Sequence, residues 1–83
     1  MQHINIDIIE MANGHLQPSW VYFDESKGHE RYHEPDCSYC ANRQQAIEAA
    51  RRSIRRIQRR LGSYVAYTRI DGASVEIDRS EDR

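Results

Sequence analysis

Four residues with zinc-ligand chemistry stand close together near the middle of the sequence: His29, His33, Cys37 and Cys40. Imidazole and thiolate are ligands that zinc prefers, and Cys-x2-Cys is the spacing of a zinc knuckle. However, zinc sites usually place a dozen residues between the two ligand pairs, and a strand would hold His29 and His33 about 13 Å apart. A structural zinc site is therefore one interpretation. A redox-active Cys-x2-Cys pair is a second interpretation, and reduced, buried thiols beside surface histidines, with no cofactor, are a third.

The most basic segment runs from Arg43 to Leu61, where apolar residues recur every three or four positions. This period predicts one amphipathic helix of about five turns, with Asn42 as its N-cap and Gly62 at its C-terminal end. The apolar stripe consists of Ile47, Ala50, Ile54, Ile57 and Leu61. The opposite side carries the candidate partner-binding residues Arg51, Arg52, Arg55, Arg56, Arg59 and Arg60.

The net charge of −1 conceals a polarised charge distribution. Residues 43–61 carry seven arginines and one glutamate, for a net charge of +6, whereas residues 1–42 carry −5 and residues 62–83 carry −2. Like charges four residues apart on a helix destabilise it by about 0.2–0.5 kcal/mol per pair. A partner that bears phosphates or carboxylates would remove this repulsion, and the alternative is a helix face that contacts only water.

The first hairpin is expected to turn at the Asn-Gly pair of residues 13–14, the strongest short signal for a two-residue turn. This register places Ile4 opposite Phe23 and Ile6 opposite Val21. The face turned away from the helix would then carry Ile9, Met11, Leu16, Trp20 and Tyr22, with Tyr67 as a neighbour on the second hairpin.

Aromatic residues and methionine are enriched in interface cores, so Met11, Trp20 and Tyr22 are predicted to bind a partner, and a homodimer through Trp20 and Tyr22 is a further expectation. The alternatives are a register slip at Pro18 or a third strand folded over this face.

The second hairpin is expected over residues 64–78, with its turn at the Asp-Gly pair of residues 71–72. This register pairs Ile70 with Ala73, Thr68 with Val75 and Ala66 with Ile77, and it directs Arg69, Glu76 and Asp78 to the polar side.

The predicted order of elements is β-β-(β)-α-β-β, in which residues 31–39 form either a short third strand or an extended loop interrupted at Pro35. It indicates an α+β domain: an antiparallel sheet of four to five strands from two hairpins, with one long amphipathic helix packed on one face. Residues 1–78 would form this single domain and residues 79–83 a disordered charged tail.

The segments WVYFDESKGHERYH, NRQQAIEAARRSIRRIQRRLG and YVAYTRIDGASVEID follow one another in the same order as the elements of two known groups. Between Trp20 and Asp78 the layout resembles HicB-type antitoxins and small phage-encoded anti-CRISPR proteins. HicB-type domains carry Gly-Cys and Gly-Asp-Thr before the helix, where this chain has Pro-Asp-Cys at 35–37 and Ala-Asn at 41–42. The anti-CRISPR resemblance implies docking on an effector complex, which blocks guide-directed DNA binding or nuclease recruitment.

The sequence contains no phosphate-binding glycine loop, nucleophile elbow or paired-carboxylate motif, so we expect no enzyme. It also lacks an apolar run of the roughly 18 residues that a membrane span needs, so we expect a cytoplasmic protein, located in the host cell if it is phage-encoded. The leading hypothesis is a non-catalytic, phage-type inhibitor that docks on a bacterial protein or ribonucleoprotein complex. The alternatives are a small nucleic-acid-binding regulator or antitoxin, and a structural zinc-binding domain.

Overall fold

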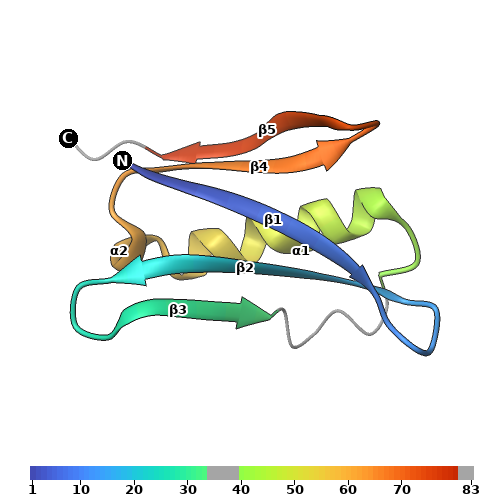
Figure 1. Ribbon diagram of the computed structural model, residues 1–83, viewed down its shortest axis with the longest axis horizontal. Coiled ribbons are helices and arrows are strands. Elements are labelled where there is room, and N and C mark those ends of the chain that lie inside the picture. Colours follow the sequence, from blue (N-terminus) through green and yellow to red (C-terminus); the bar gives the residue numbers. More distant parts are fainter. Residues whose placement is uncertain (34–39, 81–83) are drawn as a thin grey trace.

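The computed structural model describes residues 1–33 and 40–80, which form a five-stranded sheet with a helix packed on one face (Figure 1). The strands are β1 (Gln2–Glu10), β2 (Leu16–Asp24), β3 (Gly28–His33), β4 (Tyr64–Ile70) and β5 (Ala73–Ser80). The helices are α1 (Arg43–Arg56) and the one-turn α2 (Gln58–Leu61). The predicted α+β class, with five strands and one long helix, is confirmed.

The sheet has the strand order β3-β2-β1-β4-β5 and is mixed rather than wholly antiparallel. Strands β1 to β3 form an antiparallel meander and β4 and β5 form a hairpin, but β1 and β4 run parallel. The direction of α1 explains this difference from the prediction. The helix runs back along the sheet after β3, so β4 begins at the same end of the sheet as β1 (Figure 1).

Strand β1 divides its pairing between two neighbours. Residues 2–6 pair with β4, and residues 7–10 pair with β2, so the strand crosses diagonally between them (Figure 1). Where β1 departs from β2, the Gln2 side chain takes the place of a strand partner: Phe23 N donates to Gln2 Oε1 at 3.0 Å, and Gln2 Nε2 donates to Phe23 O at 2.9 Å. The same nitrogen donates to Leu61 O at 3.0 Å. At the opposite end, Arg43 donates to the carbonyl of Arg69.

The predicted two-residue turn at residues 13–14 is wrong. Gly14 N donates to Met11 O at 2.9 Å and Met11 N donates to His15 O at 2.8 Å, so the loop has three residues. Only Gly14, at φ 83°, adopts positive φ there, which is the usual arrangement of a three-residue hairpin loop. The Asn13 side chain favours this loop, since its Oδ1 accepts a hydrogen bond from His15 N at 3.0 Å.

The extra loop residue shifts the pairing of β1 and β2 by one position, so Asp7 pairs with Ser19 rather than with Trp20. A shift of one residue turns every side chain of a strand to the other face. Trp20 and Tyr22 are therefore buried, with 1% and 6% of their surface exposed, whereas Val21 and Phe23 lie on the outer face. The expected pairs of Ile4 with Phe23 and Ile6 with Val21 are thus not formed. The cause is the loop, not Pro18.

The main core lies between the sheet and the helices. Its buried members are Ile4, Ile6, Trp20, Tyr22, Ala50, Ile54, Leu61, Tyr64 and Ala66. Tyr32 of β3 stacks on Trp20, with ring centroids 4.5 Å apart. A smaller cluster, formed by Cys40, Ala46 and Ala49, packs against Ile8 and Leu16, so Leu16 also faces inward rather than outward as predicted.

The predicted single helix of residues 43–61 is interrupted at Ile57, whose φ of −105° and ψ of 16° separate α1 from α2. The predicted N-cap is confirmed, because Asn42 Oδ1 accepts from Gln45 N at 3.0 Å. Gln45 Oε1 in turn accepts from Ala41 N at 2.7 Å, and Gly62 ends α2 at φ 65°. Within the described residues, neither helix has the length and apolar character that a bilayer crossing requires.

The second hairpin turns at residues 71–72 as predicted, and the pairs Ile70 with Ala73 and Thr68 with Val75 are confirmed. Beyond Tyr67, which pairs with Glu76, a bulge interrupts the register and Ala66 pairs with Asp78 instead of Ile77. A bulge re-aims the side chains that follow it. Asp78 therefore points inward, with 7% of its surface exposed, and not to the polar side. Strand β5 continues to Ser80, so two residues of the predicted tail belong to the sheet, and residues 81–83 lie outside the described part.

Replacing Trp20 and Phe23 in turn tests the shifted register. We expect Trp20→Ala to lower the free energy of unfolding by about 3–5 kcal/mol, because it empties a core position. Phe23→Ala should lower it by less than about 1 kcal/mol, since that ring is 47% exposed. Urea unfolding followed by far-ultraviolet circular dichroism measures both. Equal losses in the two variants would contradict the register.

Candidate binding surface on the helices

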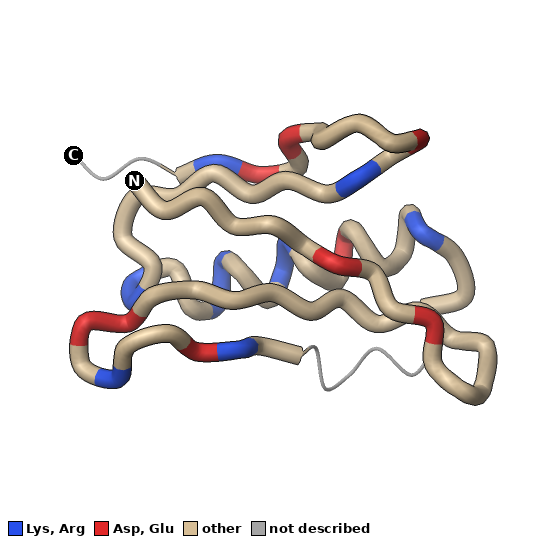
Figure 2. The backbone as a smooth tube through the Cα atoms, in the orientation of Figure 1, with Lys and Arg blue, Asp and Glu red and all other residues tan. Residues whose placement is uncertain are grey.

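The six arginines predicted to bind a partner are all exposed on α1 and α2, on the side away from the sheet. This arginine face consists of Arg51, Arg52, Arg55, Arg56, Arg59 and Arg60. Figure 2 shows basic residues recurring along the helix behind the strands. The apolar stripe of α1 fixes the orientation, because burying Ala50 and Ile54 against the sheet turns the arginines to solvent.

Most of the arginine face has no compensating negative charge. Within the described ranges, Arg51, Arg52, Arg59 and Arg60 form no ion pair with a carboxylate. Glu48, the acidic residue of α1, accepts a hydrogen bond from Gln44 Nε2 at 3.3 Å. The like-charge pairs 51/55 and 52/56 lie within α1, where charges of one sign four residues apart repel each other. The break at Ile57 lies between the members of the pairs 55/59 and 56/60.

Asp78 of β5 holds Arg55. Arg55 Nη2 lies 3.1 Å from Asp78 Oδ1, and Arg55 Nε donates to Asp78 Oδ2 at 3.4 Å. Tyr64 Oη donates to the same Oδ2 at 2.8 Å. The bulge in β5 makes these contacts possible, since without it Asp78 would point to the outer face. The network ties the middle of the arginine face to the far edge of the sheet.

Burial and hydrogen bonding shift the pKa values in this network. Burial raises the pKa of Asp78, but hydrogen bonds from Arg55 and Tyr64 and the charge of Arg55 outweigh it, so the pKa lies below its ordinary value. Burial, followed by the hydrogen bond to Asp78 and its negative charge, raises the pKa of the Tyr64 phenol. The pair therefore consists of a carboxylate and a protonated phenol at neutral pH.

Two shallow hollows lie between the arginine side chains. One, of about 250 Å³, is lined by Glu48, Arg51, Arg52 and Arg55. The other, of about 420 Å³, is lined by Arg55, Arg56, Gln58, Arg59 and Gly62. Guanidinium groups around such hollows suit the oxygens of phosphates and carboxylates, because the planar fork donates two parallel hydrogen bonds. The arrangement can bind anions.

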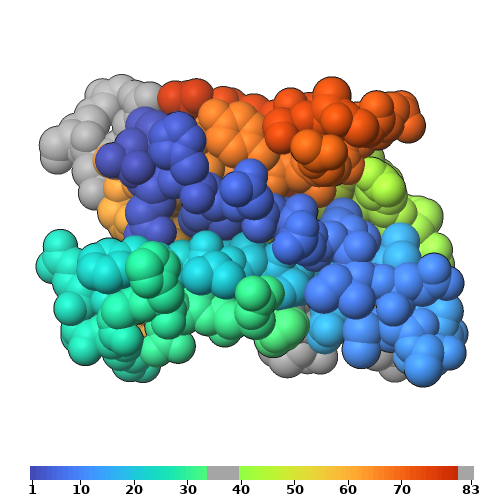
Figure 3. Space-filling model, viewed as in Figure 1, coloured from blue at the N-terminus to red at the C-terminus, as the bar shows by residue number. Residues whose placement is uncertain are grey.

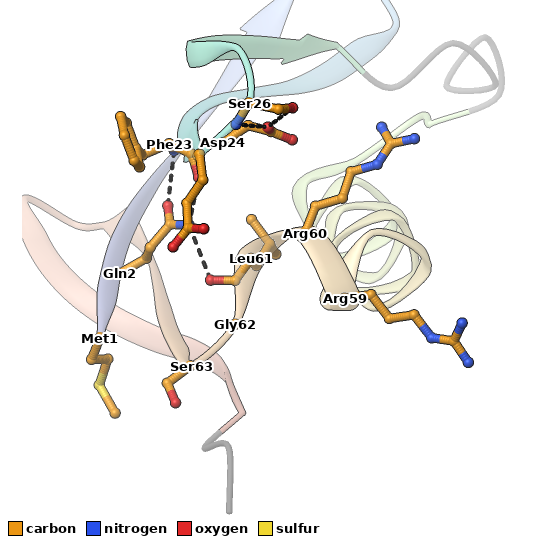
Figure 4. Close-up of a pocket in the computed structure, with 11 residues that line it drawn as sticks. Met1, Gln2, Phe23, Asp24, Ser26, Arg59, Arg60, Leu61, Gly62 and Ser63 are labelled. Atoms are coloured by element: carbon orange, nitrogen blue, oxygen red, sulfur yellow. Dashed lines mark hydrogen bonds between the residues drawn. The ribbon is translucent and has the colours of Figure 1, made fainter.

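A larger pocket of about 680 Å³ opens at the end of the sheet where β1 begins (Figure 4). The Gln2 amide spans it, and the side chains of Arg59 and Arg60 extend away from this amide. The Asp24 carboxylate in its wall accepts hydrogen bonds from Ser26 Oγ at 2.6 Å and Ser26 N at 2.8 Å, which lower the pKa of Asp24. The polar groups of this pocket thus hold strands and turns together.

The residues predicted as zinc ligands are separated. His29 and His33 are exposed on the outer side of β3, whereas Cys40 is buried on the helix side, packed with Ala46 and Ala49. Cys37 lies outside the described residues. Among the residues that are described, no three metal-ligating side chains come together. The three predicted ligands that can be placed therefore do not form one site.

The predicted aromatic partner surface needs correction. Trp20 and Tyr22 belong to the core and do not lie on the outer face as predicted, while Met11 is 42% exposed beside the first hairpin loop. Val21 and Phe23 occupy the outer positions instead, with 38% and 47% of their surface exposed. The signal for this outcome was Asn13, whose side chain suits a three-residue loop as well as a two-residue turn.

Acid unfolding tests the Asp78 network. Because folding lowers the pKa of Asp78, its carboxylate stabilises the fold at pH values above the unfolded pKa near 3.8, and this stabilisation disappears as pH falls through the folded pKa. We expect Asp78→Asn to be less stable at neutral pH and to lose stability less steeply below pH 4. Urea titrations between pH 2 and 7 measure this, and an acid limb as steep as that of the wild type would contradict it.

Glu76→Gln is the matched control for Asp78→Asn. The hydrogen bond from Arg79, at 2.7 Å, also lowers the pKa of Glu76, but this pair is exposed. Salt screens exposed pairs far more than buried ones, so 0.5 M NaCl should remove the effect of Glu76→Gln and leave part of the effect of Asp78→Asn.

No protein-family model, no curated protein and no solved structure matches the chain.

Proposed function

We propose that this protein is a non-catalytic docking protein whose arginine face binds a phosphate-bearing surface of a nucleic-acid-handling bacterial complex and inhibits the complex by occupying that surface. One observation carries the proposal: four exposed arginines on one side of two successive helices have no carboxylate partner in the described structure. An uncompensated row of this kind raises the free energy of the isolated protein, and an anionic partner lowers it again.

The spacing and the residue type favour phosphate. Arginines four apart on a helix are about 6 Å apart along its axis, so a row of them can contact successive charges of a polyanion. Each guanidinium also makes bidentate hydrogen bonds with phosphate oxygens, which lysine does not. Eleven of the twelve basic residues of the chain are arginines. The arginine face can therefore recognise oxyanions by their geometry and not by charge alone.

The charge of the remaining chain favours directional docking. Residues 1–42 and 62–83 together carry a net charge of −7 against +6 on the helical segment. A polyanion would thus be attracted to the helix side first, which steers the molecule into one orientation. Loose binding to any nucleic acid is weakened by the near-zero total charge. This supports docking on a defined complex over coating of free nucleic acid.

The resemblance in layout to phage-encoded anti-CRISPR proteins suggests the class of complex. A guide-loaded effector exposes both RNA phosphates and a groove that awaits DNA, and an arginine face that covers either would stop target binding. The second candidate is a small nucleic-acid-binding regulator, or an antitoxin, that uses the same arginines on free duplex. The uncompensated arginines support both candidates equally. The two differ in their target: the regulator would bind free duplex, whereas the docking protein would bind the assembled complex.

Reversing two charges of the arginine face tests the proposal. We expect Arg52→Glu with Arg59→Glu to lower the amount of a purified guide-loaded effector retained on the tagged protein by tenfold or more. Lys27→Glu with Arg79→Glu gives the same net charge but changes exposed residues outside the face, and it should retain the effector within about twofold. Equal loss in both double variants, or in neither, would remove the arginine face from the proposal.

A gel shift with a 20-base-pair duplex distinguishes the second candidate. Direct binding by phosphate contacts weakens steeply as salt rises, with a slope that follows the number of contacts. Tight duplex binding at 0.15 M salt that is lost in Arg52→Glu with Arg59→Glu would favour the regulator over the docking protein. The thermal stability of the variant should equal or exceed that of the wild type, because like-charge repulsion is relieved, so lost binding would not reflect unfolding.

A further inference from the structure

Four aromatic side chains, which we call the ring row, lie on the outer face of the sheet, the face seen in Figure 3 that no described element covers. The ring row consists of His29 on β3, Phe23 on β2, His3 on β1 and Tyr67 on β4. These are four neighbouring strands of the sheet. The ring row and the arginine face therefore lie on opposite sides of the molecule.

Ring contacts and one amide hold the row together. The Phe23 and His29 rings meet edge to face with centroids 5.4 Å apart, across a β2–β3 pair. The His3 and Tyr67 rings are stacked with centroids 6.2 Å apart, across β1 and β4. The Gln2 amide connects the two pairs. Gln2 precedes His3 on β1, and its side chain forms hydrogen bonds with the backbone N and O of Phe23 on β2. All four rings therefore stand on strands, whose backbone fixes the positions of the side chains.

The ring row is open to solvent. Phe23 is 47% exposed, His3 and His29 are exposed and Tyr67 is half-buried, and none of the four belongs to the core clusters. An outward strand position is normally polar, and a phenylalanine there leaves apolar ring surface in water. A ligand with flat apolar faces would cover that surface. Nucleobases are such ligands, and they stack on phenylalanine, tyrosine and histidine.

Charge at both ends of the row fits a nucleic-acid strand. Arg31 lies on the outer side of β3 two residues from His29, and Arg69 lies on the outer side of β4 two residues from Tyr67. Arg31 Nη1 donates to Ser19 Oγ at 3.3 Å, which holds its guanidinium on this face. An arginine beside each end of an aromatic row can contact the phosphates that flank stacked bases.

We infer that the ring row binds single-stranded RNA, with its bases stacked on the four rings. Hydrogen-bonded strands lie about 4.8 Å apart, and β1 and β2 are farther apart at this end, where the Gln2 amide bridges them, so the row spans more than about 14 Å, room for a few unpaired nucleotides. A duplex is disfavoured, because its base faces are hidden by pairing and stacking. RNA is favoured over DNA because Asn5, which pairs with Tyr67, and the two imidazoles place hydrogen-bonding groups beside the rings, where 2′-hydroxyls can meet them.

Fluorescence anisotropy with a labelled 12-nucleotide RNA of mixed sequence, at 0.1 M salt, tests the inference. We expect Phe23→Ala with Tyr67→Ala to weaken binding at least about tenfold, as the loss of a stacking partner predicts. Phe23→Tyr with Tyr67→Phe keeps both rings and should bind within about threefold of the wild type. Met11→Ala with Val75→Ala, which removes exposed apolar side chains outside the row, is the matched control and should also bind like the wild type.

The other outcomes overturn the inference. Equal binding by the alanine variant and the wild type, or no RNA binding by the wild type, excludes the ring row as an RNA site. Affinity for DNA of the same sequence that equals the affinity for RNA excludes the assignment to RNA. If Arg52→Glu with Arg59→Glu abolishes RNA binding and the ring variant does not, the RNA contacts the arginine face, and the proposed function stands without this second site. Emission from Trp20, the single tryptophan, should be unchanged in the ring variants and reports that they are folded.

Discussion

The structure depends on how β1 shares its backbone hydrogen bonds between β4 and β2. A strand of nine residues that pairs fully with both neighbours would force them into one regular sheet. Here each neighbour receives roughly half of β1, and the two diverging regions are filled by side chains, Gln2 at one end and Arg43 at the other. This diagonal course joins the meander and the second hairpin. It also allows the helix to lie across both, and thereby to place its arginines.

A second constraint links the two surfaces. The bulge in β5 turns Asp78 toward the helix, where the carboxylate holds Arg55 and accepts a hydrogen bond from Tyr64. The one-residue shift in the first hairpin similarly exchanges the faces of β2, burying Trp20 and leaving Phe23 outside. Each irregularity is a single residue, and each decides which side chains a partner can reach. The arginine face and the ring row are thus both products of local departures from regular pairing.

The sequence predicted those features that depend on nearby residues. The helical stripe, the Asn42 cap and the Asp-Gly turn are set within a few positions, and all three are confirmed, with Asp71 and Gly72 both at positive φ as a two-residue turn requires. The Asn-Gly pair was misleading because its composition allows two loops that differ by one residue. The bulge at Ile77 and the parallel pairing of β4 with β1 depend on contacts with backbone that is distant in the sequence. No short sequence pattern predicts them. The arginine face was predictable, since it needed only the helical period, whereas the ring row required the correct register.

Strand β1 comes first in the chain and β4 is separated from it by the helices, so the central pair of the sheet joins residues more than sixty positions apart. Such a pairing carries a large loop-closure entropy and slows folding. During synthesis on a ribosome, the meander emerges well before the helix that covers Trp20 and Tyr22. The nascent chain therefore passes through a stage in which these two rings are exposed, and it completes its fold only after β4 and β5 have left the ribosome.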